Sequence, residues 1–438
     1  MLLRNIDEAM QFVEENDVKF IRLTFCDIFG NQKNISIMPG ELPRAVQCGI
    51  PFEASAVKGF MSENLGGLGA AELLLFPDLA TMAFLPWRPS TGRVLRVFCD
   101  IRCPNGKPFL GDGRFMLRQA LQRLEQANLS CRLGTECEFY LLELNDDGTI
   151  SKRPQDQAGY LDIAPLDKGE DVRRQICLYL EEMGIQPQKS HHERGPGQNE
   201  IDFKAAEPLR AADDLTSFKS VVKTVANYNG LYASMLPKPF PKQYGCGLHI
   251  HFSLSQDGKS IFAPEILQSE ELGKQFIAGI LRRIREITLF LNPLTNSYAR
   301  FGSFEAPAYI TWSDKNRFQL ISFPIAGDNS VHMELRSPDA CLNPYLAFAL
   351  LLNAGLDGVK EKLDLAQPQC LNDDGSPSRL PNDLGEAITA AEYSEFVQSI
   401  ITEGILRHFV DAKREEWHYY QQHQDKAAAE EELYFGVY

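Results

Sequence analysis

Three kinds of sequence feature are scarce or absent, and each absence narrows the possible functions. The ten cysteines are scattered over 438 residues without a C-x-x-C pair, which argues against a disulfide framework or a zinc site. Free thiols fit a reducing compartment, so we expect a cytoplasmic protein. No apolar run approaches the roughly 20 residues that span a bilayer, and the N-terminus lacks the apolar core of a signal peptide. The sequence therefore predicts no membrane partner.

Positive charge and the common nucleotide motifs are scarce as well. Lys and Arg total 44 against 59 Asp and Glu, which gives a net charge of -15. Because nucleic-acid binding depends on a basic surface, we expect no nucleic-acid partner. There is no G-x-x-x-x-G-K-[ST] and no complete G-x-G-x-x-G. If the protein uses ATP, it must bind the nucleotide with another architecture.

The length exceeds that of a single hydrophobic core, so we expect two domains. The turn-rich stretch 103–108 is the expected boundary. Before it, the patterns predict a helix at 5–16, a hairpin of strands at 20–25 and 34–38, a mobile loop at 64–69, and strands at 73–76, 82–85 and 94–100. After it, they predict helices at 114–127, 172–183, 212–228, 271–291, 344–362 and 391–420, strands at 131–144, 249–254, 308–311 and 331–336, and a solvated helical tail at 426–432.

Two carboxylates one residue apart, Glu136 and Glu138, stand in a segment with strand character, 134–139. On a strand they project to the same face, where they repel each other unless something positive lies between them. A hard divalent cation such as magnesium or manganese suits oxygen ligands of this kind. Taken alone, the motif fits an exposed strand face with two solvated carboxylates at least as well.

Paired residues of ligand type recur elsewhere in the chain. A single histidine or glutamate is more often structural, but several segments that each offer a pair jointly predict a metal site. One of these segments, 191–200, is turn-rich, and such loops often carry ligands. The further pairs are His249 with His251, Glu334 with Arg336, and Glu193 with Glu200.

Four positively charged residues are further candidates for the site: Lys238, Arg300, Arg317 and Arg336. Arginine holds carboxylates and phosphates through two parallel hydrogen bonds. Each of these residues alone is more often a surface group. Together with a metal site, they predict binding of anionic substrates.

These segments, in this order, resemble glutamine synthetase of the bacterial type I form. The most specific matches are 134–139, 191–203, 235–254, 292–317 and 334–357. The resemblance implies an α+β fold with an N-terminal β-grasp domain, residues 1–102, and an α/β catalytic domain with a curved antiparallel sheet, residues 103–438. It also implies a homo-oligomer, a dodecamer of two hexameric rings, in which the first domain of one subunit completes the active site of the next.

The resemblance implies an ATP-dependent ligase that phosphorylates the side chain of glutamate before ammonia attacks the γ-glutamyl phosphate. Two or more Mg²⁺ or Mn²⁺ ions would align the nucleotide phosphates and neutralise developing charge. The implied ligands are Glu138, Glu193 and Glu200 for one ion, and Glu136, His249 and Glu334 for the other.

The resemblance assigns the substrates to further residues. Glu305 would close the site and accept a proton, and Glu53 would belong to the ammonium site. Glutamate would be bound by Arg300, Arg336 and Gly245, and the nucleotide by His251, Ser253, Phe203 and Arg317, with Arg317 contacting the transferred phosphate.

Departures from the family pattern surround the substrates and spare the metal ligands. The ammonium-site segment reads Phe-Glu-Ala-Ser-Ala at 52–56 instead of Phe-Asp-Gly-Ser-Ser, and Tyr244 replaces an asparagine. Ser322 and His332 stand where the family has arginines, the segment between Arg300 and Glu305 is one residue short, and 370–384 lacks the tyrosine that some members adenylylate. Three functions stay open: a glutamate–ammonia ligase, a ligase for polyamines or other amines, and a non-catalytic relative.

Overall fold

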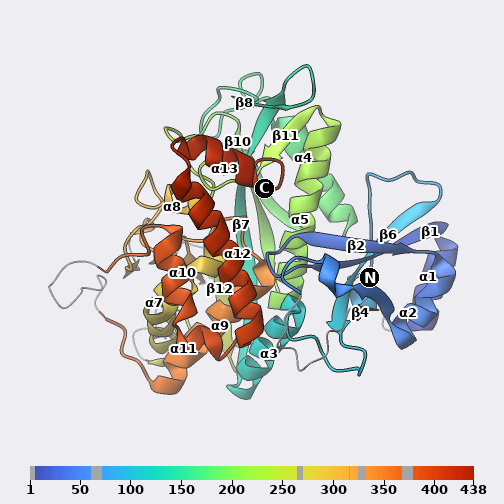
Figure 1. Ribbon diagram of the computed structural model, residues 1–438, viewed down its shortest axis with the longest axis horizontal. Coiled ribbons are helices and arrows are strands. Elements are labelled where there is room, and N and C mark those ends of the chain that lie inside the picture. The colour runs from blue at the N-terminus through green and yellow to red at the C-terminus, as the bar shows by residue number, and fades with distance from the viewer. Residues whose placement is uncertain (1–4, 61–71, 264–269, 315, 324–331, 367–377) are drawn as a thin grey trace.

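A computed structural model describes residues 5–60, 72–263, 270–314, 316–323, 332–366 and 378–438. Figure 1 shows a small N-terminal sheet, in blue, beside a larger sheet that long helices accompany. The small sheet has the order β2-β1-β6-β4-β3, with β5 beside β6. Helices α1 (Ile6–Glu15) and α2 (Leu42–Cys48) belong to the same part, whose strands are β1 (Val18–Cys26), β2 (Gln32–Ile37), β3 (Ile50–Glu53), β4 (Glu72–Pro77), β5 (Ala83–Phe84) and β6 (Arg93–Arg102).

The centre of the small sheet is the parallel pair of β1 and β6, while its other pairings are antiparallel. A parallel pair requires a crossover connection, and the chain between β1 and β6 supplies it with α2 and the remaining strands. The hairpin predicted at 20–38 is confirmed as β1 and β2. Asp27 shapes its turn, because the Asp27 Oδ1 atom accepts hydrogen bonds from the Phe29 and Asn31 amides at 3.0 and 2.9 Å.

The larger sheet is built around the 16-residue strand β7 (Leu129–Leu144). Its order is β14-β15-β16-β12-β7-β10-β9, and β8, β11 and β13 pair beside this path. All its pairings are antiparallel except that of β14 with β15. The other strands are β8 (Ile150–Pro154), β9 (Pro187–His192), β10 (Gln198–Ala206), β11 (Leu231–Ser234), β12 (Leu248–Gln256), β13 (Lys259–Ser260), β14 (Trp312–Ser313), β15 (Ile321–Ser322) and β16 (Met333–Leu335).

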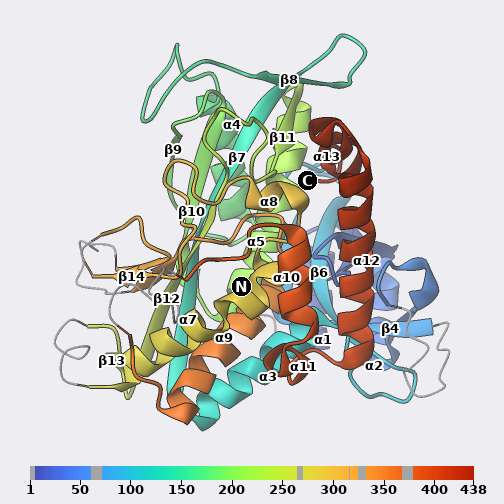
Figure 2. The same cartoon turned by 60° about the vertical axis from the view of Figure 1, so that its left-hand side comes forward.

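Side-chain alternation gives this sheet a core face and an open face. On β7, Cys137 and Phe139 are fully buried, whereas Glu136 and Glu138, which alternate with them, point the other way. The core face packs against α3 (Gly113–Gln126) and α5 (Pro208–Tyr228). In Figure 2 the strands β9, β10, β7 and β12 stand in the left half and the helices α10 and α12 in the right half. The carboxylates therefore lie on the face turned away from the core.

Two long helices, α7 (Leu272–Leu291) and α9 (Pro344–Glu361), pack unusually closely on one another. Glycines allow the close approach, since a Cβ atom added at Gly358 would lie 2.1 Å from the Gln275 carbonyl oxygen. The remaining helices are α4 (Glu170–Glu182), α8 (Thr295–Tyr298), α10 (Leu384–Glu392), α11 (Glu395–Gln398), α12 (Glu403–Gln422) and α13 (Lys426–Tyr434).

Arg114, at the start of α3, ties the small sheet to the helices of the larger part. It is 2% exposed and pairs with Asp78 at 2.6 Å, with Asp100 at 3.2 Å and with Asp213 of α5. Several carboxylate partners offset the cost of burying the positive charge of Arg114. Removing the guanidinium would leave buried carboxylates unpaired. This network fixes how the two sheets sit relative to each other.

Two predictions made from the sequence are wrong in detail, and a third is not tested. The helix predicted at 391–420 is three helices, because the Ser394 hydroxyl accepts a hydrogen bond from the Val397 amide and starts a new helix there. The strand predicted at 308–311 makes only isolated bridges, and the ladder begins at Trp312. The loop predicted at 64–69 lies outside the described residues.

The C-terminal tail predicted to be solvated is instead packed into the fold. Helix α13 buries Ala429 and Tyr434, which are 0% and 1% exposed. Glu430 accepts hydrogen bonds from Thr295 and Asn296 at 2.9 and 2.7 Å. The low-complexity sequence concealed these contacts, which depend on single residues at helical spacing. Among the described helices, none has the length and apolar character needed to cross a bilayer.

Candidate active site

The sheet register brings the predicted ligands from separate strands to the open face. Glu136 on β7 lies opposite His249 on β12 and opposite Asp202 on β10, and Glu138 lies opposite Glu200. Residues directly opposite one another on antiparallel strands have Cβ atoms about 5 Å apart on the same face. Four carboxylates therefore share one small area with an imidazole.

The first group of ligands consists of Glu136, His249 and Glu334, whose donor atoms all lie within 4.8 Å of one another. The His249 Nδ1 atom lies 3.1 Å from Glu136 Oε2 and 3.3 Å from Glu334 Oε1. The Nε2 atom of His251 lies 3.0 Å from the other oxygen of Glu136. Burial acts to raise the pKa of Glu136, but the hydrogen bonds with both histidines outweigh it and lower this pKa. The group thus surrounds a carboxylate that stays ionised.

The second group consists of His191, Glu193 and Glu200, again with donor atoms within 4.8 Å of one another. Glu138 adjoins it, across the strand pair from Glu200. One oxygen of Glu138 accepts a hydrogen bond from the Gly247 amide at 2.9 Å, which holds that carboxylate in place. The predicted ligands Glu138, Glu193 and Glu200 therefore share one region, and the structure adds His191 to them.

The carboxylates of this region are only partly compensated by positive charge, although the Lys189 Nζ atom lies 3.2 Å from Asp202 Oδ2. Burial, followed by repulsion from Glu138 and Asp202, raises the pKa of Glu200 well above its ordinary value. Burial also raises the pKa of Glu138. Among the described residues, the buried Asp202 Oδ1 atom has no hydrogen-bond partner. Buried acids in this arrangement are costly without a cation, so a hard divalent ion fits the donor set.

Asp202 was missed from the sequence, although a signal existed. It follows Glu200 at the spacing of two that defines one face of a strand. The segment 191–200 was expected to be turn-rich, which holds for 193–197 and not for the residues on either side. It forms the hairpin of β9 and β10, with 193–197 in the turn, because β10 pairs with residues 133–140 of β7. Glu200 is therefore held on a strand.

A buried histidine–aspartate pair supports the hairpin turn. The His192 Nε2 atom lies 3.0 Å from Asp156 Oδ1, and the same oxygen accepts the Gly197 amide at 2.8 Å. The other ring nitrogen of His192 lies 2.6 Å from the Glu193 carbonyl oxygen. These donors and acceptors are already satisfied by the turn, so we regard this cluster as support for Glu193 and not as a metal site.

A cavity of about 50 Å³ opens beside the second group. Arg300 reaches its wall, is 3% exposed, and donates hydrogen bonds to the Ser337 and Arg336 carbonyl oxygens at 2.8 and 3.0 Å. Arg336 in turn donates to Glu334 at 2.5 Å. Carboxylates and arginines therefore meet in one wall, which includes Glu138, Glu193, His249, Arg300, Arg336 and Gly245.

Tyr244 and the segment around Glu305 close the other side of the cavity. The rings of Tyr244 and Phe304 stack with centroids 4.1 Å apart, and the Lys238 Nζ atom lies 4.6 Å from the Phe304 centroid. Arg194 pairs with Glu305 at 2.7 Å. Sequence reasoning missed Arg194 and Phe304, which have no motif spacing that distinguishes them from surface residues.

The two positions where the resemblance expects arginine serve the first ligand group here. The Ser322 hydroxyl donates a hydrogen bond to Glu334 Oε2 at 2.7 Å. The rings of His332 and His251 meet edge to face, with centroids 4.8 Å apart. These side chains support the ligands and add no permanent positive charge toward a nucleotide.

Some predicted site residues belong neither to the cavity wall nor to the two ligand groups, namely Glu53, Arg317, Phe203 and Ser253. Glu53 is exposed at the end of β3, and Arg317 is exposed in a turn. Phe203 faces the core, with its ring centroid 4.8 Å from that of Phe218. Ser253 lies farther along β12, at the strand spacing that continues from His249 and His251. Their predicted roles stay predictions.

Comparison with known proteins assigns the chain to a family. A family model described as the glutamine synthetase catalytic domain matches residues 110–432, and one described as the glutamine synthetase β-grasp domain matches residues 17–104. The chain belongs to the glutamine synthetase family. The glutamine synthetases of Methanosarcina mazei and Clostridium saccharobutylicum are each 40% identical to it, over 428 and 423 residues, with 94% of each chain covered.

Solved structures agree with this assignment. A chain titled as a GmaS/ADP complex has a TM-score of 0.84 and 29% identity, and the match covers 98% of this chain and 99% of that one. Glutamine synthetase of Plasmodium falciparum has a TM-score of 0.86 at 22% identity, covers 99% of both chains, and speaks for the fold alone. The predicted α+β fold with a β-grasp domain is confirmed.

Membership of the glutamine synthetase family makes the protein a ligase of the glutamate–ammonia type that depends on ATP. The family generally uses divalent cations, and the two carboxylate groups on the open face are consistent with that requirement. Family membership leaves the amine that this chain accepts, its metal preference and its assembly to be proposed.

Proposed function

We propose that the protein joins ammonia to the side-chain carboxylate of glutamate, converting ATP to ADP and phosphate and releasing glutamine. The observation that carries this proposal is the convergence of two carboxylate groups and two buried arginines around one small cavity. Phosphoryl transfer from ATP needs positioned positive charge rather than covalent chemistry. This arrangement supports such a site without a glycine-rich phosphate loop.

Two Mg²⁺ or Mn²⁺ ions, when bound, would supply the positive charge that neutralises the phosphates. Glu136, His249 and Glu334 would hold one ion. Glu138, Glu193 and Glu200 would hold the other, and we add Asp202 as a carboxylate that faces both groups. The raised pKa of Glu200 supports this assignment, because a nearby cation would restore the ionised form.

The glutamate substrate would lie in the cavity, with its α-carboxylate toward Arg300 and Arg336. Both guanidinium groups are positioned by hydrogen bonds within the fold, which reduces the cost of ordering them when the substrate binds. Glu305, held by Arg194, would accept the proton that the attacking amine loses. The segment that carries Glu305 would also exclude water from the acyl phosphate.

The small cavity favours ammonia as the amine. Tyr244 and Phe304 stack beside Glu305, and the whole cavity, which glutamate must share with the amine, is about 50 Å³. The same aromatic pair favours a second candidate, a short alkyl amine, because an apolar group could pack on the rings. In either case Glu53 would be supplied by the neighbouring subunit of a ring, and we propose the dodecamer of two hexameric rings as the assembly.

Phosphate release from ATP and glutamate tests the proposal directly. The assay compares ammonia, methylamine and a diamine, each with Mg²⁺ or Mn²⁺. Release that is fastest with ammonia supports the proposal, whereas a preference for methylamine or the diamine supports an amine ligase. Glu138→Ala should abolish turnover and leave the assembly intact. Tyr244→Ala should shift the preference toward the larger amines, and the exposed-residue variant Glu125→Gln serves as the control.

A further inference from the structure

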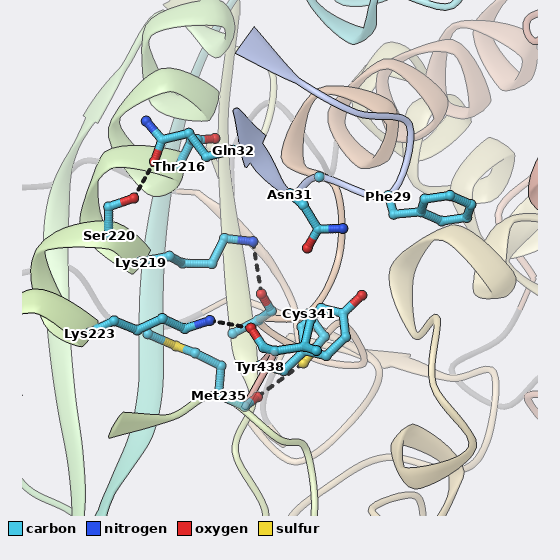
Figure 3. A pocket seen from close by; sticks show the side chains of 13 residues that line it. Phe29, Asn31, Gln32, Thr216, Lys219, Ser220, Lys223, Met235, Cys341 and Tyr438 are labelled. Atoms are coloured by element: carbon cyan, nitrogen blue, oxygen red, sulfur yellow. Dashed lines mark hydrogen bonds between the residues drawn. The ribbon is translucent and has the colours of Figure 1, made fainter. Parts of the chain in front are cut away.

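A second cavity, of about 220 Å³, lies at the junction between the N-terminal sheet and the catalytic part. It shares no lining residue with the cavity beside Glu138. Figure 3 shows its walls: Asn31 comes from the β1–β2 turn and Gln32 from the start of β2. Lys219 and Lys223 come from α5, and Tyr438 from the C-terminal segment. The space exceeds that needed for a water molecule many times over and is lined by several hydrogen-bond donors.

Both lysines point their ammonium groups toward the wall that contains Cys341 and Tyr438 (Figure 3). The Lys219 Nζ atom donates hydrogen bonds to the Ala340 and Leu342 carbonyl oxygens, each at 3.0 Å. The Lys223 Nζ atom donates to the Val437 carbonyl oxygen at 2.5 Å. Within the described part of the chain, neither lysine forms an ion pair with a carboxylate. Both ammonium groups donate their hydrogen bonds to neutral carbonyl oxygens, and the buried carboxylate of Asp339 acts on Lys219 without forming an ion pair with it.

The arrangement is electrostatically unfavourable without a further ligand. Lys219 and Lys223 are four residues apart on one helix, where like charges destabilise each other. Burial lowers the pKa of Lys219, and burial together with repulsion from Lys219 lowers the pKa of Lys223 to about 8. Taking a charged group out of water is costly unless an opposite charge accompanies it. An anion between the two ammonium groups would remove both penalties.

We propose that this cavity is a binding site for a small anion with carboxylate or phosphate oxygens, held by Lys219 and Lys223. The site does not depend on the ligase reaction, because its walls are separate from the cavity beside Glu138. It has a physical link to that reaction, however. Lys219 holds the chain just after Arg336, through Ala340 and Leu342, and Arg300 holds the carbonyl oxygen of Arg336 itself. An anion that attracts Lys219 therefore acts on the segment that positions both arginines.

Site-resolved lysine labelling tests the proposal on the complete protein. The protein is labelled briefly with acetic anhydride in the presence of inorganic phosphate, of succinate or of neither, and modified peptides are quantified by mass spectrometry. The expected result is severalfold protection of Lys223 by at least one anion, with no change at the exposed Lys107. Protection by phosphate alone, by succinate alone or by both identifies the oxygen chemistry that the site prefers, and each of these results supports it.

A charge-removing variant gives a second measurement. Lys223→Gln keeps the side chain's length and removes its charge, and Lys107→Gln is the matched control. By calorimetry, Lys223→Gln should weaken binding of the protecting anion about tenfold or more, as expected for loss of a charged hydrogen bond. Unchanged labelling of Lys223 with both anions, or equal affinities in the two variants, would overturn the proposal. Neither measurement uses ATP or glutamate, so failure here is independent of the proposed reaction.

Discussion

Glu200→Gln should stabilise the metal-free protein while removing its activity. Glu200 is 7% exposed, lies opposite Glu138, and belongs to a group with Glu193 whose donor atoms are within 4.8 Å of one another. Two unit charges at that separation repel by roughly 3 kcal/mol at an effective dielectric constant of 20. Glutamine keeps the shape and removes one of the charges. The gain is at most of this size, because Glu200 can also escape the repulsion by taking up a proton.

The stability that Glu200→Gln gains over the unsubstituted protein should depend on pH. The pKa of Glu200 is raised in the folded protein, so the folded state retains the proton to a higher pH than the unfolded chain does. The stability that this proton contributes is fully present below the ordinary carboxyl pKa and is lost as the pH rises through the folded-state pKa. The advantage of Glu200→Gln over the unsubstituted protein should therefore increase with pH.

Thermal unfolding in the presence of EDTA measures this difference, and Glu125→Gln, an exposed substitution on α3, is the control. With Mn²⁺ added, the unsubstituted protein should unfold at the higher temperature, because it binds the cation more tightly than Glu200→Gln does. Size-exclusion chromatography checks that the assembly is unchanged. A metal-free Glu200→Gln protein that unfolds at a lower temperature than the unsubstituted protein, with Glu125→Gln neutral, would refute the reasoning.

Three other substitutions, one of them with a matched control, test the fold. Gly358→Ala should lower the free energy of unfolding by about 1–3 kcal/mol in urea, because the new Cβ atom would lie 2.1 Å from the Gln275 carbonyl oxygen and push α7 from α9; a neutral result would contradict that packing. Arg114→Met should lower the free energy of unfolding by about 3–5 kcal/mol, because buried carboxylates lose their partner. Arg118→Met, at a more exposed guanidinium, should lower it by less than about 1 kcal/mol. Tyr434→Phe should cost about 1 kcal/mol in thermal unfolding, because its hydroxyl accepts an α8 amide at 3.2 Å; an unchanged melting temperature would mean that this contact contributes nothing.

Strong periodic patterns made much of the fold predictable from the sequence. The helices at 114–127 and 271–291 and the strand at 131–144 have continuous apolar faces, and the structure places them within two residues of these bounds. The helix predicted at 391–420 failed because Ser394 starts a new helix, a local hydrogen bond that periodicity does not reveal. The prediction of a solvated tail at 426–432 was wrong because the burial of this helix depends on contacts with α8, far away in sequence.

The convergence of the proposed ligands was predictable where strand spacing pairs them. Glu136 with Glu138 and His249 with His251 both follow the spacing of two, and the register then unites the strands. The partners that complete the site were not predictable. Arg194 reaches Glu305 only because the β9–β10 hairpin faces the segment around that residue, a relation set by tertiary structure.

Anomalous diffraction from crystals grown with Mn²⁺ tests the central claim most directly. We predict two anomalous peaks in each chain, one among Glu136, His249 and Glu334 and one among Glu138, Glu193 and Glu200. A chain without a peak on this face of the sheet, at a Mn²⁺ concentration that supports turnover, would contradict the account.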